Sequence, residues 1–80
     1  MERELRLQGP ALAFLRRRSG KTQEEVAAAA AMARSQVSDY ENGRTVNLKI
    51  STLVRYLRAV EADLYDLYAV IEQFERRVGK

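Results

Sequence analysis

The sequence contains no cysteine and no histidine among its 80 residues. Without cysteine, the chain has no disulfide bonds, no thiolate metal ligands and no cysteine nucleophile. Without histidine, it lacks the side chain that most often serves as a general acid or base near neutral pH. We therefore expect no enzymatic activity, no metal site and no cofactor.

Long apolar segments are missing too. The longest uninterrupted apolar run extends from Val26 to Ala33, whereas a helix that crosses a bilayer needs ~20 apolar residues. No signal peptide, internal repeat or low-complexity linker is recognisable. Hydrophobic residues make up 46% of the 80 residues, which is enough for one small helical core but not for two. We expect a single all-α domain over residues 1–80, in the cytoplasm, with neither a membrane nor a small-molecule partner.

The clearest local signal begins at Thr22. Its hydroxyl can accept from the backbone N–H of Glu25, and the Glu25 carboxylate can reach back, which makes a capping box. Val26, Ala27 and Ala30 then share one face at helical spacing, and the alanines keep that face small where another helix crosses closely. The sequence therefore predicts a helix that begins near Thr22.

The next segment predicts a second short helix, from Ala33 or Arg34 to Asn42. Gly43 ends it, because glycine adopts the left-handed conformation without steric cost. Its inward-facing apolar residues are Val37 and Tyr40. The opposite face carries polar side chains of lengths that reach base edges in a major groove: Arg34, Ser35, Gln36, Ser38 and Asp39. Two short helices joined by a tight turn indicate a helix-turn-helix that reads DNA, although such a polar face can also be merely solvated.

Three segments of this region together resemble the Cro/CI-type, or XRE-family, helix-turn-helix domain of phage repressors and small bacterial regulators. They are residues 22–27 (TQEEVA), 34–38 (RSQVS) and 40–44 (YENGR). The resemblance extends from about Pro10 to Tyr68. It implies a compact five-helix, lambda-repressor-like DNA-binding domain in which helices 2 and 3 form the motif and a long C-terminal helix follows.

Two residues at the turn depart from the family pattern. The family commonly has glycine where this chain has Ala31, and a capping serine or threonine where it has Ala33. An alanine in the left-handed conformation costs on the order of 1 kcal/mol. We therefore expect the turn to be strained or differently shaped.

The helix before the motif is expected to begin at Gly9 and Pro10, because proline is favoured at the first helical position. Residues 1–9 are then an N-terminal arm, and residues 10–60 are the DNA-binding core. As an alternative, the two leucines of the arm extend the helical packing.

The helix after the motif is expected to begin near Asn47 or Lys49. Its apolar stripe follows spacings of three and four residues: Ile50, Leu53, Val54 and Leu57. Together with the first helix, it should supply most of the hydrophobic core.

The last helix is expected over residues 63–78, with Asp63 as its N-cap and Asp66 in its first turn. A heptad-type apolar seam runs along it: Leu64, Leu67, Ile71, Phe74 and Val78. Leu64 and Leu67 should finish the domain core. A domain of this size has little surface left for the other three, so we assign a homodimer interface to Ile71, Phe74 and Val78.

Charge divides the chain unevenly. Residues 1–60 carry eleven basic and six acidic side chains, and residues 61–80 carry three and five. The basic part coincides with the expected DNA-binding core, and attraction to phosphates is largely electrostatic. A symmetric dimer would present two recognition helices to a palindromic operator whose half-sites lie about 34 Å, or a multiple of it, apart.

Residue chemistry and the resemblance together assign the DNA contacts. The expected base readers are Arg34, Ser35, Gln36 and Asp39. The expected phosphate-binding and positioning residues are Gln23, Ser38, Asn42, Arg44 and Lys49. Arg34 should be the principal base reader, because its planar guanidinium matches O6 and N7 of guanine. Asp39 accepts from a cytosine amine, braces Arg34, or is a plain surface residue.

Two residues are given structural roles. The family pattern implies that Gln23 also buttresses the recognition helix. Glu41 is expected to pair with a nearby arginine, Arg16 or Arg17, instead of contacting DNA.

Three functions fit these expectations. The favoured one is a sequence-specific regulator that binds double-stranded DNA and represses transcription by occluding a promoter. The second is an antitoxin of a toxin–antitoxin pair, which binds DNA and masks a toxin with its C-terminal helix or with residues 1–8. The third is a protein-interaction adaptor without DNA affinity, and the arginine-led polar face argues against it.

Overall fold

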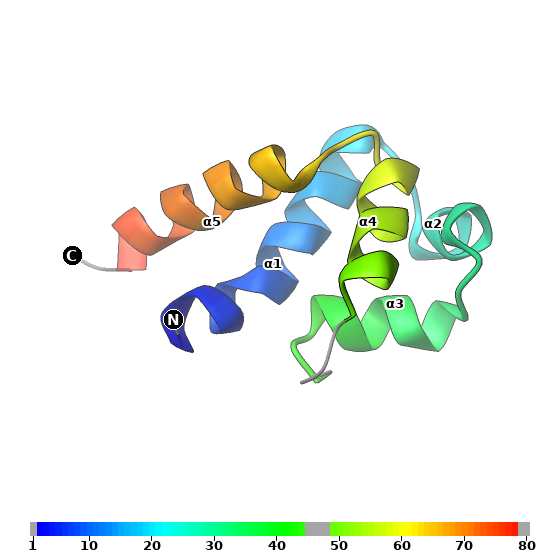
Figure 1. Ribbon diagram of the computed structural model, residues 1–80, viewed down its shortest axis with the longest axis horizontal. Coiled ribbons are helices and arrows are strands. Elements are labelled where there is room, and N and C mark those ends of the chain that lie inside the picture. Colours follow the sequence, from blue (N-terminus) through cyan, green and yellow to red (C-terminus); the bar gives the residue numbers. More distant parts are fainter. Residues whose placement is uncertain (1, 45–48, 79–80) are drawn as a thin grey trace.

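The protein is described by a computed structural model, in which the backbone is described for residues 2–44 and 49–78 and the side chains for residues 8–44 and 49–77. These residues form five helices and no strand (Figure 1): α1 (Glu2–Ser19), α2 (Gln23–Ala30), α3 (Arg34–Glu41), α4 (Ile50–Ala59) and α5 (Leu64–Val78). The predicted all-α, five-helix fold is confirmed.

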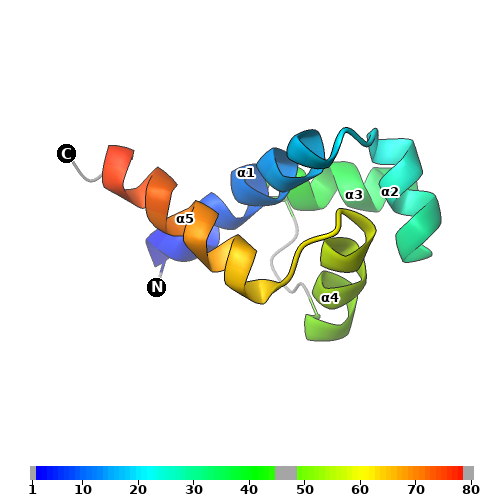
Figure 2. The same cartoon turned by 90° about the horizontal axis from the view of Figure 1, so that it is seen from above.

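Helix α1 packs against two other helices. It contacts α5 along one side and α3 along another, while α2 packs against both α3 and α4. Figure 2 shows α1 between α5 and α3. The largest fully buried side chains come from every helix except α5: Tyr56, Leu12, Leu15, Leu57, Val26 and Val37.

The start of α1 differs from the prediction. The helix begins at Glu2, so residues 2–9 are its first half and not an arm, and Pro10 lies inside it. Gly9 has a packing role: a Cβ added there would lie 2.7 Å from the backbone oxygen of Glu41 and 2.8 Å from that of Tyr40. Gly9 therefore marks the close crossing of α1 and α3. A proline inside a helix removes one backbone donor, and its ring crowds the carbonyl four residues earlier. The helix does extend through the expected arm, but the side chains of its two leucines lie outside the described residues, so their packing stays a prediction.

The predicted start of α2 is confirmed. The Glu25 N–H donates to the Thr22 hydroxyl at 3.1 Å, and the Thr22 N–H donates to the Glu25 carboxylate at 2.8 Å. The predicted inner face of this helix is buried: Val26, Ala27 and Ala30. Local capping and one small apolar stripe are thus enough to define α2.

Helix α4 begins at Ile50, with Lys49 as its N-cap; Asn47, the other predicted start, lies outside the described residues. Leu53 and Leu57 are buried as predicted, but the Ile50 side chain is 66% exposed. The stripe prediction missed Tyr56, which is fully buried. Its hydroxyl needs a polar partner inside the core, and spacing alone does not reveal one.

The predicted N-cap of α5 is also confirmed, and Asp66 completes it as a capping box. The Asp66 N–H donates to the Asp63 carboxylate at 2.8 Å, and the Asp63 N–H donates to Asp66 at 3.0 Å. Leu67 belongs to the core, whereas Leu64, predicted to join it, is 48% exposed.

The expectation that the domain cannot cover the distal part of α5 is wrong. Ile71 is only 8% exposed within the core, and Phe74 meets Phe14 of α1 edge to face, with ring centroids 5.9 Å apart. The reason is the packing of α1 along α5, which the spacing of apolar residues within one helix does not reveal. Ile71 is therefore buried and Phe74 half-buried within the chain, and the side chain of Val78 lies outside the described residues.

Candidate nucleic-acid interface

The turn between α2 and α3 is built around Ala31. This residue adopts the left-handed conformation, with φ 57° and ψ 50°, as the predicted turn requires. The Met32 N–H donates to the Ala27 carbonyl at 2.9 Å and closes the end of α2. The Arg55 guanidinium of α4 donates to the Ala30 carbonyl at 3.0 Å, a contact that sequence reasoning missed. Arg55 thus ties the turn to a helix outside the motif.

The start of α3 has only part of a cap. Ala33 occupies the N-cap position and has no side-chain acceptor to offer. The Gln36 side-chain oxygen accepts from the Ala33 N–H at 2.9 Å. One of the expected base readers is therefore partly engaged in the free protein, and its amide NH₂ is the group left to donate to DNA.

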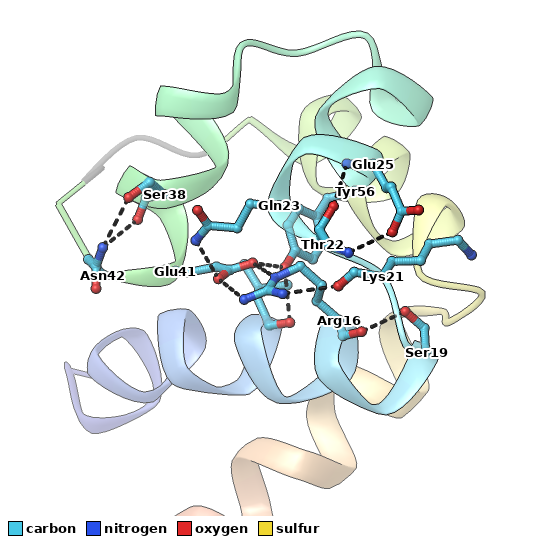
Figure 3. Close-up of polar contacts among 11 residues, drawn as sticks. Arg16, Ser19, Lys21, Thr22, Gln23, Glu25, Ser38, Glu41, Asn42 and Tyr56 are labelled. Atoms are coloured by element: carbon cyan, nitrogen blue, oxygen red, sulfur yellow. Dashed lines mark hydrogen bonds and ion pairs between the residues drawn. The ribbon is translucent and has the colours of Figure 1, made fainter.

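The end of α3 is fixed by a buried carboxylate. Glu41 is 7% exposed and accepts hydrogen bonds from three other helices (Figure 3). Arg16 of α1 donates from Nε at 2.7 Å and from Nη2 at 3.0 Å. Gln23 of α2 donates at 3.0 Å, and the Tyr56 hydroxyl of α4 donates at 2.6 Å. The predicted pairing of Glu41 is confirmed, with Arg16 as its partner.

These contacts shift the pKa values of Glu41, Arg16 and Tyr56. Burial raises the pKa of Glu41, but the hydrogen bonds from Arg16, Tyr56 and Gln23 lower it by more, so it lies below the ordinary 4.5. The hydrogen bond to Glu41 raises the pKa of Arg16. Burial, together with the hydrogen bond to Glu41, raises the pKa of Tyr56. At neutral pH the cluster therefore contains one carboxylate, one guanidinium and one neutral phenol.

Gln23 shows the buttressing that the resemblance implied. Its amide joins the first residue of α2 to the last residue of α3. Because Glu41 is also held by α1 and α4, four helices meet at this carboxylate. The C-terminal end of α3 is thereby fixed, and with it the direction in which the outer face of the helix points.

The predicted site residues lie at the surface. Those that are exposed are Arg34, Ser35, Gln36, Asn42, Arg44 and Lys49. Those that are half-buried are Gln23, Ser38 and Asp39. The sequence therefore placed its candidate DNA contacts on accessible surface.

Two pairs of these residues contact each other. The Asn42 side-chain amide donates to the Ser38 backbone oxygen at 2.9 Å and to the Ser38 hydroxyl at 3.2 Å. Asp39 pairs with Arg44 at 3.5 Å, and not with Arg34 as one of the sequence alternatives had it. A surface pair of this kind contributes little stability, but it places a cation beside the only carboxylate among the expected base readers.

Arg34 differs from the other site residues. It is the exposed first residue of α3, and within the described part of the chain no hydrogen bond or ion pair engages its guanidinium. The positive end of a helix dipole disfavours a cation at this position. Local stability therefore does not explain an arginine here.

The described residues show neither a metal-binding cluster nor a membrane-spanning helix. Within residues 2–44 and 49–78, no three acidic, histidine or cysteine side chains gather to hold a metal ion. None of the helices in these ranges is long and apolar enough to cross a membrane.

Comparison with known proteins agrees with this geometry. No curated protein and no solved structure gives a significant match to the chain. The family model described as "Helix-turn-helix domain" matches residues 9–67, which include α2, the turn, α3 and all of α4. Because this match covers well over half of the chain, the protein belongs to the helix-turn-helix domain family, and this membership supports a DNA-binding regulator.

Proposed function

We propose that the protein is a cytoplasmic transcriptional regulator of Cro/CI type that binds a specific double-stranded DNA sequence with α3 in the major groove. It represses transcription by occluding a promoter. The observation that carries this proposal is Arg34, an exposed arginine without a partner among the described residues, at the helix end that disfavours a cation. The electrostatic cost of that position is offset when the guanidinium meets guanine O6 and N7.

The rest of the outer face complements Arg34. Ser35 is exposed beside it, and the free NH₂ group of Gln36 can donate to a base while its oxygen stays on the Ala33 N–H. Asp39 accepts from a cytosine amine only if it leaves Arg44; otherwise Arg44 offsets its repulsion from the phosphates. This arrangement makes Arg34 the main determinant of sequence preference and Asp39 a secondary one.

Phosphate contacts surround this face. Arg44 and Lys49 are exposed on either side of the segment between α3 and α4, and Asn42 caps the end of α3. Gln23 lies at the start of α2, where backbone N–H groups favour an anion. These contacts set the register of the protein on the duplex, and a second copy on the same duplex would make the preferred operator palindromic.

The test is selection of bound sequences from a random DNA pool at about 0.15 M salt, where nonspecific phosphate binding is weak. We expect one enriched motif that contains a guanine. Arg34→Ala should lower the affinity for that motif by about 10- to 100-fold, the loss for one bidentate base contact, and should leave the weak binding to random DNA almost unchanged.

Arg77→Ala is the matched control, because Arg77 is an exposed arginine near the C-terminal end of α5 and its loss removes the same charge. It should change both affinities little. Failure to enrich any motif would contradict sequence-specific binding. An equal loss on random DNA after Arg34→Ala would make Arg34 a phosphate contact.

A further inference from the structure

The end of α2 has one backbone carbonyl that the helix itself does not satisfy. Ala30 is the last residue of α2 and is only 1% exposed. The N–H groups of Ala31 and Met32 return to the carbonyls of Ala28 and Ala27, so no described backbone N–H donates to the Ala30 carbonyl. Its partner is the Nε–H of Arg55 on α4, at 3.0 Å. Because a buried carbonyl is costly to leave unpaired, Arg55 fills a need that α2 cannot meet.

This carbonyl belongs to the turn of the motif. It is part of the planar peptide unit between Ala30 and Ala31, and the φ angle of Ala31 sets how that unit is oriented relative to the residues that follow. Ala31 has φ 57°, a conformation that is unfavourable for alanine. A donor anchored on α4 and bonded to the Ala30 oxygen keeps the unit in this orientation. Arg34 begins α3 three residues further on, so its direction depends on the same turn.

Two consecutive residues of α4 reach the two ends of α3. The hydroxyl of the fully buried Tyr56 donates to Glu41 at the C-terminal end. Arg55 precedes Tyr56 in the sequence and bonds to the turn before the N-terminal end. Arg55 is exposed, and within the described ranges no ion pair engages it. An ion pair therefore does not explain this arginine, whereas its hydrogen bond to the turn does.

We propose that Arg55 is a positioning residue for DNA recognition, which fixes the turn at Ala31 and thereby the direction in which Arg34 approaches the bases. This inference rests on the proposed function and names how its principal base reader is held. Contacts to base edges require closely positioned side chains, whereas attraction to phosphates is electrostatic and independent of sequence. Loss of the Arg55 contact therefore lowers the sequence preference and leaves nonspecific binding almost unchanged.

Two substitutions of Arg55 separate its hydrogen bond from its charge. Glutamine has an amide nitrogen as many bonds from the backbone as Nε of arginine, so Arg55→Gln keeps a donor and loses the charge. Methionine has a similar length and no donor, so Arg55→Met loses both. Arg58→Met is the matched control, because Arg58 is an exposed arginine of the same helix whose guanidinium has no described ion pair.

The first readout is affinity for the selected motif and for random DNA, at about 0.15 M salt. We expect Arg55→Met to bind the motif about fivefold more weakly than Arg58→Met, a smaller loss than removal of Arg34 itself, and to bind random DNA equally well. Arg55→Gln should bind the motif as Arg58→Met does. Equal motif affinities for Arg55→Met and Arg58→Met would overturn the proposal. Losses shared by Arg55→Gln and Arg55→Met on both kinds of DNA would also overturn it, and would make Arg55 a phosphate contact.

A double-mutant cycle tests whether Arg55 acts through Arg34. In the Arg34→Ala background, Arg55→Met should cause almost no further loss of motif affinity, because the contact that it positions is already gone. Fully additive losses would contradict this route.

Hydrogen exchange in the free protein tests the turn without DNA. The Met32 N–H, which donates to the Ala27 carbonyl, should exchange several-fold faster in Arg55→Met than in Arg58→Met, and Arg55→Gln should restore its protection. Equal exchange in the three variants would overturn the proposal.

The two proposals fail separately. Faster Met32 exchange in a protein that enriches no DNA motif would contradict the proposed function and leave the contact of Arg55 with the turn standing. A motif that Arg55→Met and Arg58→Met bind equally well would contradict the positioning role alone.

Discussion

The two ends of α3 are held in different ways. At its start, the turn contains a left-handed alanine, the N-cap has no side-chain acceptor, and Gln36 supplies a single exposed hydrogen bond. At its end, the buried Glu41 carboxylate accepts hydrogen bonds from α1, α2 and α4. The end is thus fixed by a buried contact with three other helices, whereas the start depends on short-range contacts and on the one hydrogen bond from Arg55 to the preceding turn. The more adjustable end is the one that carries Arg34.

The largest effect is expected from Glu41→Ala. It leaves the largely buried Arg16 guanidinium without its partner, and breaking a buried pair costs about 3–5 kcal/mol. Denaturant unfolding should show a loss of this size, which is a large part of the stability of a small domain. Asp39→Ala is the control, because it removes a half-buried surface carboxylate from the same helix, and it should change stability by less than about 0.5 kcal/mol. Similar losses in both variants would contradict the special role of the C-terminal end.

The second largest loss of stability is expected from Tyr56→Phe, and the size of that loss should depend on pH. Removing a buried hydrogen bond to a charged group costs about 1.5–3 kcal/mol. The lowered pKa of Glu41 means that the unfolded chain binds a proton at higher pH than the folded protein does. The stabilisation is therefore complete above the ordinary pKa of 4.5 and disappears as pH falls through the lower folded value.

Unfolding curves collected from neutral pH down to about pH 3 test this prediction, since that range spans the ordinary glutamate pKa. Tyr56→Phe removes one of the donors that lower the pKa of Glu41. Its stability should therefore fall less steeply with acid than that of the original protein. Parallel pH profiles would show that the phenol does not act through Glu41.

Gly9→Ala tests the crossing of α1 over the end of α3. Inside a helix this substitution ordinarily stabilises by about 0.5–1 kcal/mol. Here the new methyl group would lie 2.7 Å from the Glu41 backbone oxygen, so we expect a loss of about 1–3 kcal/mol from overpacking. Denaturant unfolding measures the sign of the change in unfolding free energy. A loss would confirm the close crossing, and a gain would mean that α1 is free to move away from α3.

The smallest effect is expected at the start of α3, from Ala31→Gly. Glycine has no Cβ to crowd the left-handed conformation, so thermal or denaturant unfolding should show a gain of about 0.5–1 kcal/mol. The same substitution at exposed Ala28, inside α2, should cost about as much. Opposite signs for the same change three residues apart would confirm that the turn is strained at Ala31, and equal signs would contradict it.

Local features were predicted well because their partners lie within one helical turn. The capping boxes at Thr22 and Asp63 each join residues three apart, so the sequence contains both halves of every contact. The exposed face of α3 followed from the same short-range periodicity. The roles of its residues in binding DNA remain predictions, since accessibility alone does not show a base contact.

Long-range features were predicted poorly, and each for a definite reason. Gly9 signalled a helix start in the sequence, but its neighbours in space are more than thirty residues away on α3. Ile71 and Phe74 were expected to need a second subunit because the sequence does not show that α1 packs along α5. Tyr56 and Arg55 carry polar groups whose acceptors, Glu41 and Ala30, lie on other helices. No spacing rule identifies such partners.

The sequence by itself determined the helical class, the extent of α2 and α3, the polar face of α3 and the absence of thiol and imidazole chemistry. These depend on capping, periodicity and composition, which act over a few residues. The tertiary structure alone decided that α1 packs along the α5 face with Ile71 and Phe74, and that four helices meet at Glu41. These depend on which helices come together, because burial and hydrogen bonding are settled by neighbours in space.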